Sequence, residues 1–242
     1  MGPLSVAERL TSVRQQIAQA ARASGRSPDE ITLVAVSKRH DQAAIRAAYA
    51  AGQRDFGENY IQEWQRKASD LADLTDLRWH FVGRLQRNKL RHLSDRMHLL
   101  HAMDGARALT ELSRRAADAG APQAMLLQVN LSGEATKGGC SEEEAAGLVR
   151  TALGLPGLQL RGLMTMPPPS TDPEQVRPFF RRLTGLRERL RDEWAGERRG
   201  ELLPCLSMGM TDDFRVAIAE GATHVRVGTA IFGTRPAAPV WA

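Results

Sequence analysis

The stretch ITLVAVSK, residues 31–38, decides the fold of this chain. Its residues 31–36 are apolar or β-branched without interruption. A run of this kind is typical of a strand buried on both faces of a parallel sheet. The run leads into Ser37 and Lys38, so the lysine lies at the carboxyl end of the strand, where α/β folds gather their functional groups. Lys38 itself leaves two interpretations open, a solvated lysine at a strand end or an amine that forms a Schiff base.

Similar apolar runs alternate with helical patterns along the whole chain. We expect strands at 31–37, 54–58, 78–83, 97–103, 124–130, 160–166, 203–208 and 224–227. Helical periodicity occupies the intervals, including a short basic helix over 84–93, and Asp41 and Ser141 stand where helix N-caps are expected. A further helix over residues 4–24 precedes the first strand. The pattern predicts a single-domain (β/α)8 TIM barrel over residues 1–242, with an extra N-terminal helix; a doubly wound open sheet is the alternative.

The composition excludes several classes of protein. Hydrophobic residues make up 42% of the 242 residues and charged residues 25%, as in ordinary globular domains with a full core. No run approaches the roughly 18 apolar residues of a transmembrane helix, and the polar N-terminus does not resemble a secretory signal. Cys140 and Cys205 are far apart and lack paired-ligand spacing, which indicates neither a disulfide framework nor a zinc site and fits a reducing cytoplasm.

The net charge of +5 raises the question of a nucleic-acid partner. The arginines, however, are interspersed with acids along helical segments, as in RRLTGLRERLRDEW at 181–194. That pattern is typical of a solvated helix face with ion pairs one turn apart. No known nucleic-acid-binding motif occurs in the sequence. We therefore expect neither a nucleic-acid nor a membrane partner.

The histidines do not form a metal-binding pattern. His80 lies within an expected strand and is interpreted as a satisfied core histidine. His92, His98 and His101 lack the spacing of metal ligands. No metal site is predicted.

Two glycine-containing segments follow the last two expected strands. The first is LSMGMTDD at 206–213, in which Ser207 offers a hydroxyl, Gly209 allows close backbone approach, and 211–213 is an expected helix N-cap. The second places Gly228 and Thr229 after the eighth strand. Either glycine alone could serve a tight turn. In a TIM barrel, however, these two loops commonly bind phosphate, and with Lys38 they suit a phosphate-bearing aldehyde such as pyridoxal 5′-phosphate.

Seven segments, in order along almost the whole chain, then carry a family resemblance. They are AVSK at 35–38, FGENY at 56–60, HFVGRLQRNK at 80–89, SGEATKGG at 132–139, GLMTM at 162–166, LSMGMTDD at 206–213 and VRVGTAIFG at 225–233. Together they resemble the pyridoxal-phosphate homeostasis protein family, which is similar to the N-terminal barrel of alanine racemase.

The resemblance implies a role for each matching residue. Lys38 would form the internal aldimine with the cofactor, and Asn59 would lie beside its ring. Arg226 would face the pyridine nitrogen and keep it unprotonated. The remaining cofactor-binding residues implied are Ser207, Met208, Gly209, Gly228 and Thr229, with Met208 either packing on the ring or belonging to the core.

The resemblance leaves open the role of one loop lysine and the shape of one loop. Lys137 either makes a second, transient cofactor contact or is a loop lysine without such a role. The sequence departs from the family pattern at Arg39 and His40, where a small hydroxyl residue is expected. That departure puts in question the shape of the loop after the first strand.

The resemblance implies a cytoplasmic, monomeric protein that stores, buffers or delivers pyridoxal 5′-phosphate, with no reaction of its own. Its partners would be the cofactor and the apoenzymes that receive it. Two alternatives stay open. One is a pyridoxal-phosphate-dependent enzyme acting on small amino acids, such as a weak racemase. The other is an aldolase-like barrel in which Lys38 binds a phosphorylated substrate without a cofactor.

Overall fold

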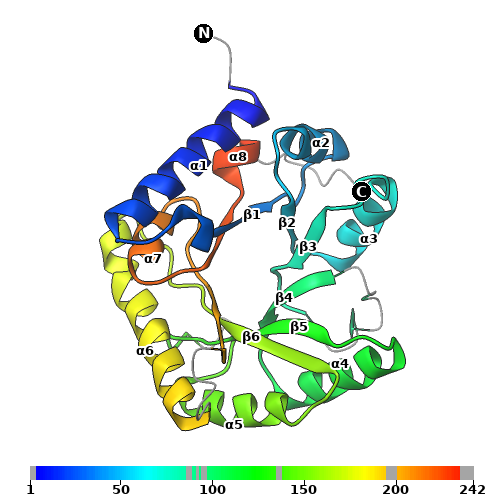
Figure 1. Ribbon diagram of the computed structural model, residues 1–242, viewed down its shortest axis with the longest axis vertical. Coiled ribbons are helices and arrows are strands. Elements are labelled where there is room, and N and C mark those ends of the chain that lie inside the picture. Colours follow the sequence, from blue (N-terminus) through cyan, green and yellow to red (C-terminus); the bar gives the residue numbers. More distant parts are fainter. Residues whose placement is uncertain are drawn as a thin grey trace.

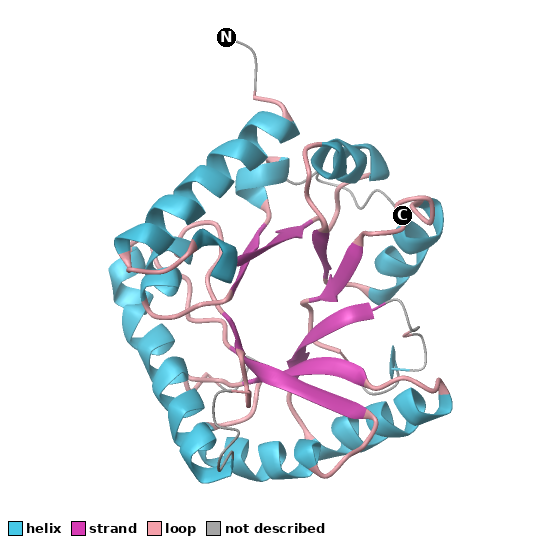
Figure 2. Cartoon of the chain, in the orientation of Figure 1, coloured by secondary structure: helices cyan, strands magenta, loops and turns pink. Residues whose placement is uncertain are grey.

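Eight parallel strands form a closed barrel, in which each strand pairs with its neighbours in sequence and β8 pairs with β1. The computed structural model describes residues 4–85, 89–90, 93, 97–134, 138–194 and 201–234. The strands surround the barrel axis and the helices form an outer ring (Figures 1 and 2). They are β1 (Thr32–Val36), β2 (Asp55–Glu58), β3 (Arg78–Phe81), β4 (Met97–Met103), β5 (Gln123–Gln128), β6 (Leu158–Met164), β7 (Cys205–Ser207) and β8 (His224–Val227). The prediction of a TIM barrel is confirmed, and the open-sheet alternative is wrong.

The helices follow the strands in the predicted order. They are α1 (Val6–Ala23), α2 (Gln42–Ala50), α3 (Ile61–Asp70), α4 (Ala106–Asp118), α5 (Glu142–Leu153), α6 (Arg177–Trp194), α7 (Phe214–Ala219) and α8 (Thr229–Phe232), with 3-10 turns η1 (Pro28–Glu30) and η3 (Pro173–Val176). The additional helix α1 packs outside the barrel against α7 and α8 (Figure 1). The Arg9 Nε group donates a hydrogen bond to the Ile231 carbonyl oxygen at 2.9 Å. The N-terminal helix thus covers the junction between the end and the start of the barrel.

The helix starts agree with the capping residues in the sequence. Asp41 Oδ1 accepts the Ala44 N–H at 2.9 Å, and Ser141 Oγ accepts the Glu144 N–H at 3.2 Å. Both caps therefore satisfy amide groups that the first helical turn leaves without partners. The short helix α8 was not predicted, and half of the residues of the basic helix expected over 84–93 lie outside the described residues.

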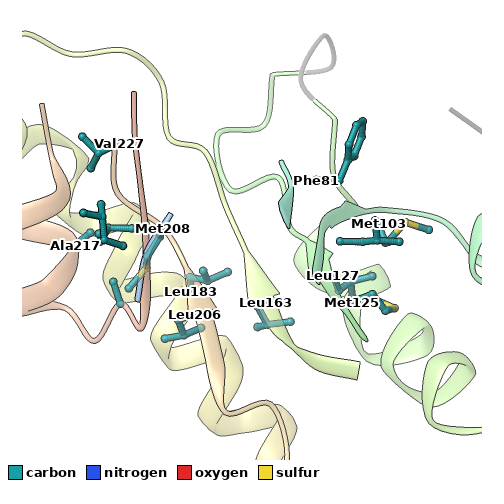
Figure 3. Close-up of a cluster of buried hydrophobic side chains, with 14 of the residues drawn as sticks. Phe81, Met103, Met125, Leu127, Leu163, Leu183, Leu206, Met208, Ala217 and Val227 are labelled. Carbon is teal, nitrogen blue, oxygen red and sulfur yellow. The ribbon is translucent and has the colours of Figure 1, made fainter. Parts of the chain in front are cut away.

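Alternation along the strands separates two layers of side chains. Outward-facing residues join the helices in a large apolar core, part of which is drawn in Figure 3, with Leu163 and Leu206 from the strands and Leu183 from α6. Burying a side chain of this size contributes roughly 1.5–3 kcal/mol. The inward-facing residues are partly apolar, as in the cluster of Val34, Val36 and Val82. Other inward positions are polar, and these polar residues connect to the site described below.

Among the described helices, none combines the length and the apolar character that spanning a bilayer would require.

Candidate functional site

A cavity of about 200 Å³ opens at the carboxyl ends of the barrel strands. Its walls come from the ends of β1 and β8 and from the loops that follow β1, β2, β3, β6, β7 and β8. The lining residues are Val36, Lys38, His40, Asn59, Val82, Met166, Met210, Thr211, Asp212, Arg226, Gly228 and Thr229. This end of a TIM barrel carries the functional residues in essentially every characterised enzyme with the fold. The closed barrel therefore brings together residues as far apart in the sequence as Lys38 and Thr229.

Lys38 lies half-buried in the turn that follows β1. The next residue, Arg39, has a positive φ of 65°, a conformation that residues other than glycine rarely adopt. Glu63 of α3 holds this turn in place, because its Oε1 accepts the Arg39 N–H at 2.6 Å. His40 then stacks on Phe232 of α8, with ring centroids 5.2 Å apart. The unusual Arg39–His40 pair thus forms an ordered turn that keeps Lys38 at the cavity.

A buried charged cluster lies beneath this turn. The Lys67 ammonium donates to Glu58 Oε1 at 2.7 Å, to Glu63 Oε1 at 2.6 Å and to the Ser37 carbonyl oxygen at 2.8 Å. The Ser37 hydroxyl also donates to Glu58 Oε1, at 2.7 Å. Burial raises the pKa of Glu58 to about 7, although Lys67 opposes the shift. The cluster fixes the backbone on both sides of Lys38, through Ser37 and through Arg39.

Asn59 follows β2 and offers the cavity an amide group. Its Oδ1 is buried and has no hydrogen-bond partner among the described residues. Burying a polar atom without a partner carries a free-energy cost of about 1–3 kcal/mol. A ligand that hydrogen-bonds to this side chain would remove that cost, so Asn59 is suited to contact a bound molecule.

Arg226, near the end of β8, supplies a positive charge to the cavity. Its Nη1 donates to Ser207 Oγ at 2.6 Å and its Nη2 to the Thr165 carbonyl oxygen at 3.1 Å. Burial lowers the pKa of Arg226 to about 10, so the guanidinium is still charged at neutral pH. The two hydrogen bonds hold its plane in one orientation.

The β8 loop brings backbone close to the cavity. A Cβ atom built on Gly228 would lie 3.1 Å from the Val36 carbonyl oxygen, which is tighter than most side chains tolerate. Glycine therefore lets the β8 loop approach the end of β1. Gly228 and Thr229 both line the cavity next to this contact.

The three predicted residues Ser207, Met208 and Gly209 lie behind the cavity wall. Ser207 is fully buried inside the barrel and bonds to Arg226. Met208 is part of the large apolar core together with Ala217 (Figure 3). Gly209 has a φ of 92°, and a Cβ there would lie 2.6 Å from the Ala217 Cβ, so the glycine serves the turn after β7. A direct contact of these three residues with a cofactor stays a prediction.

The segment that does face the cavity after β7 is Met210 to Asp212. The neighbouring Asp213 precedes α7 but does not cap it through its side chain, because its Oδ1 accepts the Met210 N–H at 2.6 Å. Met210 and Met166 line the cavity, and Met210 lies two residues beyond Met208, the methionine considered from the sequence. Sequence reasoning missed these lining residues, although their positions directly after strands were a usable signal. Lys137 lies outside the described residues.

At the opposite end of the barrel, Asp55, His80 and His98 form a compact group, with ligand atoms within 4.8 Å of one another. Arg78 pairs with both carboxylate oxygens of Asp55, at 2.8 and 2.6 Å. His80 is fully buried and hydrogen-bonded, as expected of a core histidine. Because Asp55 is neutralised by Arg78, we assign no metal to this group.

Comparisons with known proteins agree with this geometry. The family model described as alanine racemase, N-terminal domain, matches residues 9–236. The pyridoxal phosphate homeostasis protein of Pseudomonas aeruginosa is 45% identical over 231 residues, covering 96% of each chain. The protein of the same name from Aquifex aeolicus is 42% identical and covers 96% of this chain and 99% of its own. The solved structure of PipY from Synechococcus elongatus with PLP bound has a TM-score of 0.83 and 38% identity, covering 95% of this chain and 100% of its own. The chain therefore belongs to the pyridoxal phosphate homeostasis protein family.

Proposed function

We propose that this protein binds pyridoxal 5′-phosphate through Lys38 and serves the homeostasis of that cofactor by storing, buffering or delivering it. One observation carries the proposal: a single cavity at the carboxyl end of the barrel unites Lys38, Asn59, Arg226, Gly228 and Thr229. When bound, the cofactor supplies an aldehyde that condenses reversibly with a primary amine, and a phosphate dianion. The residues of the chain must bind and orient this group, as described next.

The chemistry of the cavity fits this cofactor. Lys38 supplies the primary amine, on a turn that Glu63 and Lys67 hold from below. The buried Asn59 Oδ1 lacks a partner among the described residues and is ready to bond a polar group. Arg226 contributes a fixed positive charge, and Gly228, which packs against the end of β1, lines the cavity beside Thr229. Residues at the end of β8 suit the phosphate, since backbone amides and a hydroxyl are typical phosphate donors.

The relatives support the same cofactor. Curated proteins 42–45% identical to this chain carry the name pyridoxal phosphate homeostasis protein, and the PipY structure contains PLP. These proteins match over nearly their whole length, so the site-forming loops fall within the compared region. The likeness supports the choice of pyridoxal 5′-phosphate over a phosphorylated aldehyde substrate in an aldolase-like barrel.

We further propose a binding role rather than catalysis. A guanidinium at the pyridine nitrogen, where the family resemblance places Arg226, opposes protonation of that nitrogen and weakens the ring as an electron sink. Such a site retains the cofactor without activating it strongly. The proposal includes a cytoplasmic, monomeric, single-domain protein whose partners are apoenzymes that require the cofactor.

A spectral titration with pyridoxal 5′-phosphate tests the binding role. Native protein should develop an absorption band at longer wavelength than the free cofactor, and Lys38→Ala should not. Lys38→Arg is the matched variant, because it keeps the positive charge but offers no primary amine. Lys89→Ala should behave as native. An unchanged spectrum of native protein with excess cofactor would contradict the proposal.

Catalysis is tested separately with the loaded protein. Incubation with small amino acids in deuterated water should leave their α-hydrogens in place, as followed by proton NMR. Exchange or racemisation that depends on Lys38 would show that the protein is an enzyme rather than a carrier.

A further inference from the structure

A continuous chain of hydrogen bonds crosses the interior of the barrel and ends at Arg226. It runs from Asp55 to His80, His101 and Ser207, and we call these four residues together with Arg226 the barrel relay. His80 Nε2 lies 2.9 Å from Asp55 Oδ1, and His80 Nδ1 lies 2.9 Å from His101 Nε2. His101 Nδ1 lies 2.8 Å from Ser207 Oγ, which accepts the Arg226 Nη1 hydrogen bond at 2.6 Å. The relay therefore connects the base of the barrel with the cavity at its other end.

For neutral histidines, the two ends of the relay fix the direction of every hydrogen bond between them. Arg226 only donates, so Ser207 Oγ accepts there and can direct its own proton to His101 Nδ1. At the other end Asp55, paired with Arg78, is an ionised acceptor and takes the His80 Nε2–H. His80 Nδ1 is then an acceptor for the His101 Nε2–H. When both histidines are neutral, a single arrangement satisfies all four bonds, and in it each ring is protonated at Nε2.

The surroundings favour that arrangement. His80 and His101 are fully buried, and burial lowers the pKa of His101 well below its ordinary value. The other titratable or charged groups that act on His101 are His80, His98, His224 and Arg226, none of which supplies a negative charge. The neutral form of His101 is therefore favoured, and an added proton on either ring would reverse the direction of the bonds toward Ser207.

We infer that Asp55, His80 and His101 are positioning residues for Arg226: they keep the Ser207 hydroxyl in the orientation that accepts the guanidinium. With the Thr165 carbonyl on its other nitrogen, Arg226 then presents one fixed edge to the cavity. The inference rests on the proposed cofactor site for its functional meaning, but the order of the protons does not depend on any ligand. It also explains why polar side chains occupy inward positions of β2, β3, β4 and β7 that apolar residues would fill at lower cost.

The relay offers a sharp set of substitutions. His101→Leu interrupts it and leaves Ser207 without its acceptor. In His101→Gln, the amide oxygen and nitrogen stand about as far apart as the two ring nitrogens, so the side chain can accept from Ser207 and donate to His80. His98→Gln is the matched control, because the His98 and His101 rings lie equally far from the His80 ring, at 5.2 Å, and His98 is not a member of the relay.

Two measurements test the inference. Nitrogen-15 NMR of the imidazoles in native protein without cofactor should show His80 and His101 neutral and protonated at Nε2. In equilibrium titrations, His101→Leu should bind pyridoxal 5′-phosphate about tenfold more weakly than native protein, the effect of losing one hydrogen bond to a charged group. His101→Gln and His98→Gln should bind within about twofold of native.

Each outcome decides a different part. A proton on His101 Nδ1, or an imidazolium ring, would overturn the order of the relay. Native-like affinity in a folded His101→Leu would overturn its positioning role. If His101→Leu does not fold, His101→Gln decides, since a tenfold loss there would show that the amide cannot replace the ring and contradict the assignment. If native protein does not bind the cofactor, the proposed function fails, while the NMR result still stands or falls by itself.

Discussion

Replacement of Lys67 by methionine should destabilise the protein strongly and in a pH-dependent way. The Lys67 side chain is 5% exposed and holds two buried carboxylates and the Ser37 carbonyl oxygen at 2.6–2.8 Å. Methionine fills a similar volume but donates no hydrogen bond, so Glu58 and Glu63 would remain buried together without a counter-charge. Removing one partner of a buried ion pair typically costs about 3–5 kcal/mol.

Urea denaturation followed by circular dichroism measures this loss. At pH 8 we expect the free energy of unfolding to fall by about 4 kcal/mol, which at a slope of roughly 2–3 kcal/mol per molar urea shifts the midpoint by about 1.5 M. Arg46→Met is the control, because its ion pair with Asp73 is exposed, and such a pair contributes about 1 kcal/mol or less.

The pH dependence separates charge from packing. Burial already raises the pKa of Glu58 above its unfolded value, and removal of Lys67 takes away the ammonium that opposes this shift. A carboxyl with a raised folded pKa binds more protons in the folded state, so the stability of the variant falls as the pH rises through the interval between the two pKa values. The loss at pH 5 should therefore be clearly smaller than at pH 8. Equal losses at both pH values, or a loss below about 1 kcal/mol at pH 8, would refute the reasoning.

Three further predictions concern other parts of the barrel. Gly209→Ala should lower the free energy of unfolding, measured in urea, by about 2–4 kcal/mol, because Gly209 has a positive φ and a Cβ there would crowd Ala217. Gly147→Ala in α5, where a Cβ meets nothing within 4 Å, should raise the free energy of unfolding by about 0.5–1 kcal/mol. Equal effects of the two substitutions would contradict the strain at Gly209. His101 has a lowered folded pKa, so the unfolded chain binds its proton first, and the contribution of His101 to stability falls from pH 7 to pH 5. His101→Gln removes this contribution, so the change in its stability between pH 7 and pH 5 should differ from native in the direction of a smaller loss, and an unchanged slope would contradict the buried neutral state. Burial raises the pKa of the Cys140 thiol to about 12, so iodoacetamide at pH 8 should label this thiol rapidly only after unfolding in urea. Mass spectrometry follows the labelling, and rapid labelling of Cys140 in the folded protein would contradict its burial.

The barrel could be predicted because its strands are continuous apolar runs. The bounds of β4 and β8 agree with those expected from the sequence, and β1 ends at Val36, two residues before Lys38. Closure of the barrel then places all strand ends on one face, so Lys38, Asn59 and Arg226 meet in one cavity although no local pattern connects them.

The loop after β7 could not be predicted in the same way. Strand β7 ends at Ser207, one residue earlier than expected, and alternation turns Ser207 inward and Met208 into the outer core. A shift of one residue at a strand end changes which side chain faces the cavity, so the lining begins at Met210.

Hydrogen bonds between side chains of separate elements could not be predicted from the sequence either. Glu63 reaches the Arg39 amide from α3, and no spacing rule predicts that contact. His80 and His101 face each other from β3 and β4, whose pairing contains a register shift next to His80. Such an irregularity breaks the simple alternation from which inward positions are derived. The barrel relay therefore became apparent only from the arrangement of the strands in space.

Whether Lys38 holds the cofactor can be tested directly, because the chain contains only four lysines, at positions 38, 67, 89 and 137. Borohydride treatment of the protein with bound pyridoxal 5′-phosphate would fix the cofactor permanently to the amine that holds it. Digestion and mass spectrometry would then identify the modified lysine. We expect one cofactor per chain, on Lys38, and no stoichiometric modification of Lys38→Arg. Stoichiometric modification of another lysine, with Lys38 unmodified, would contradict this expectation.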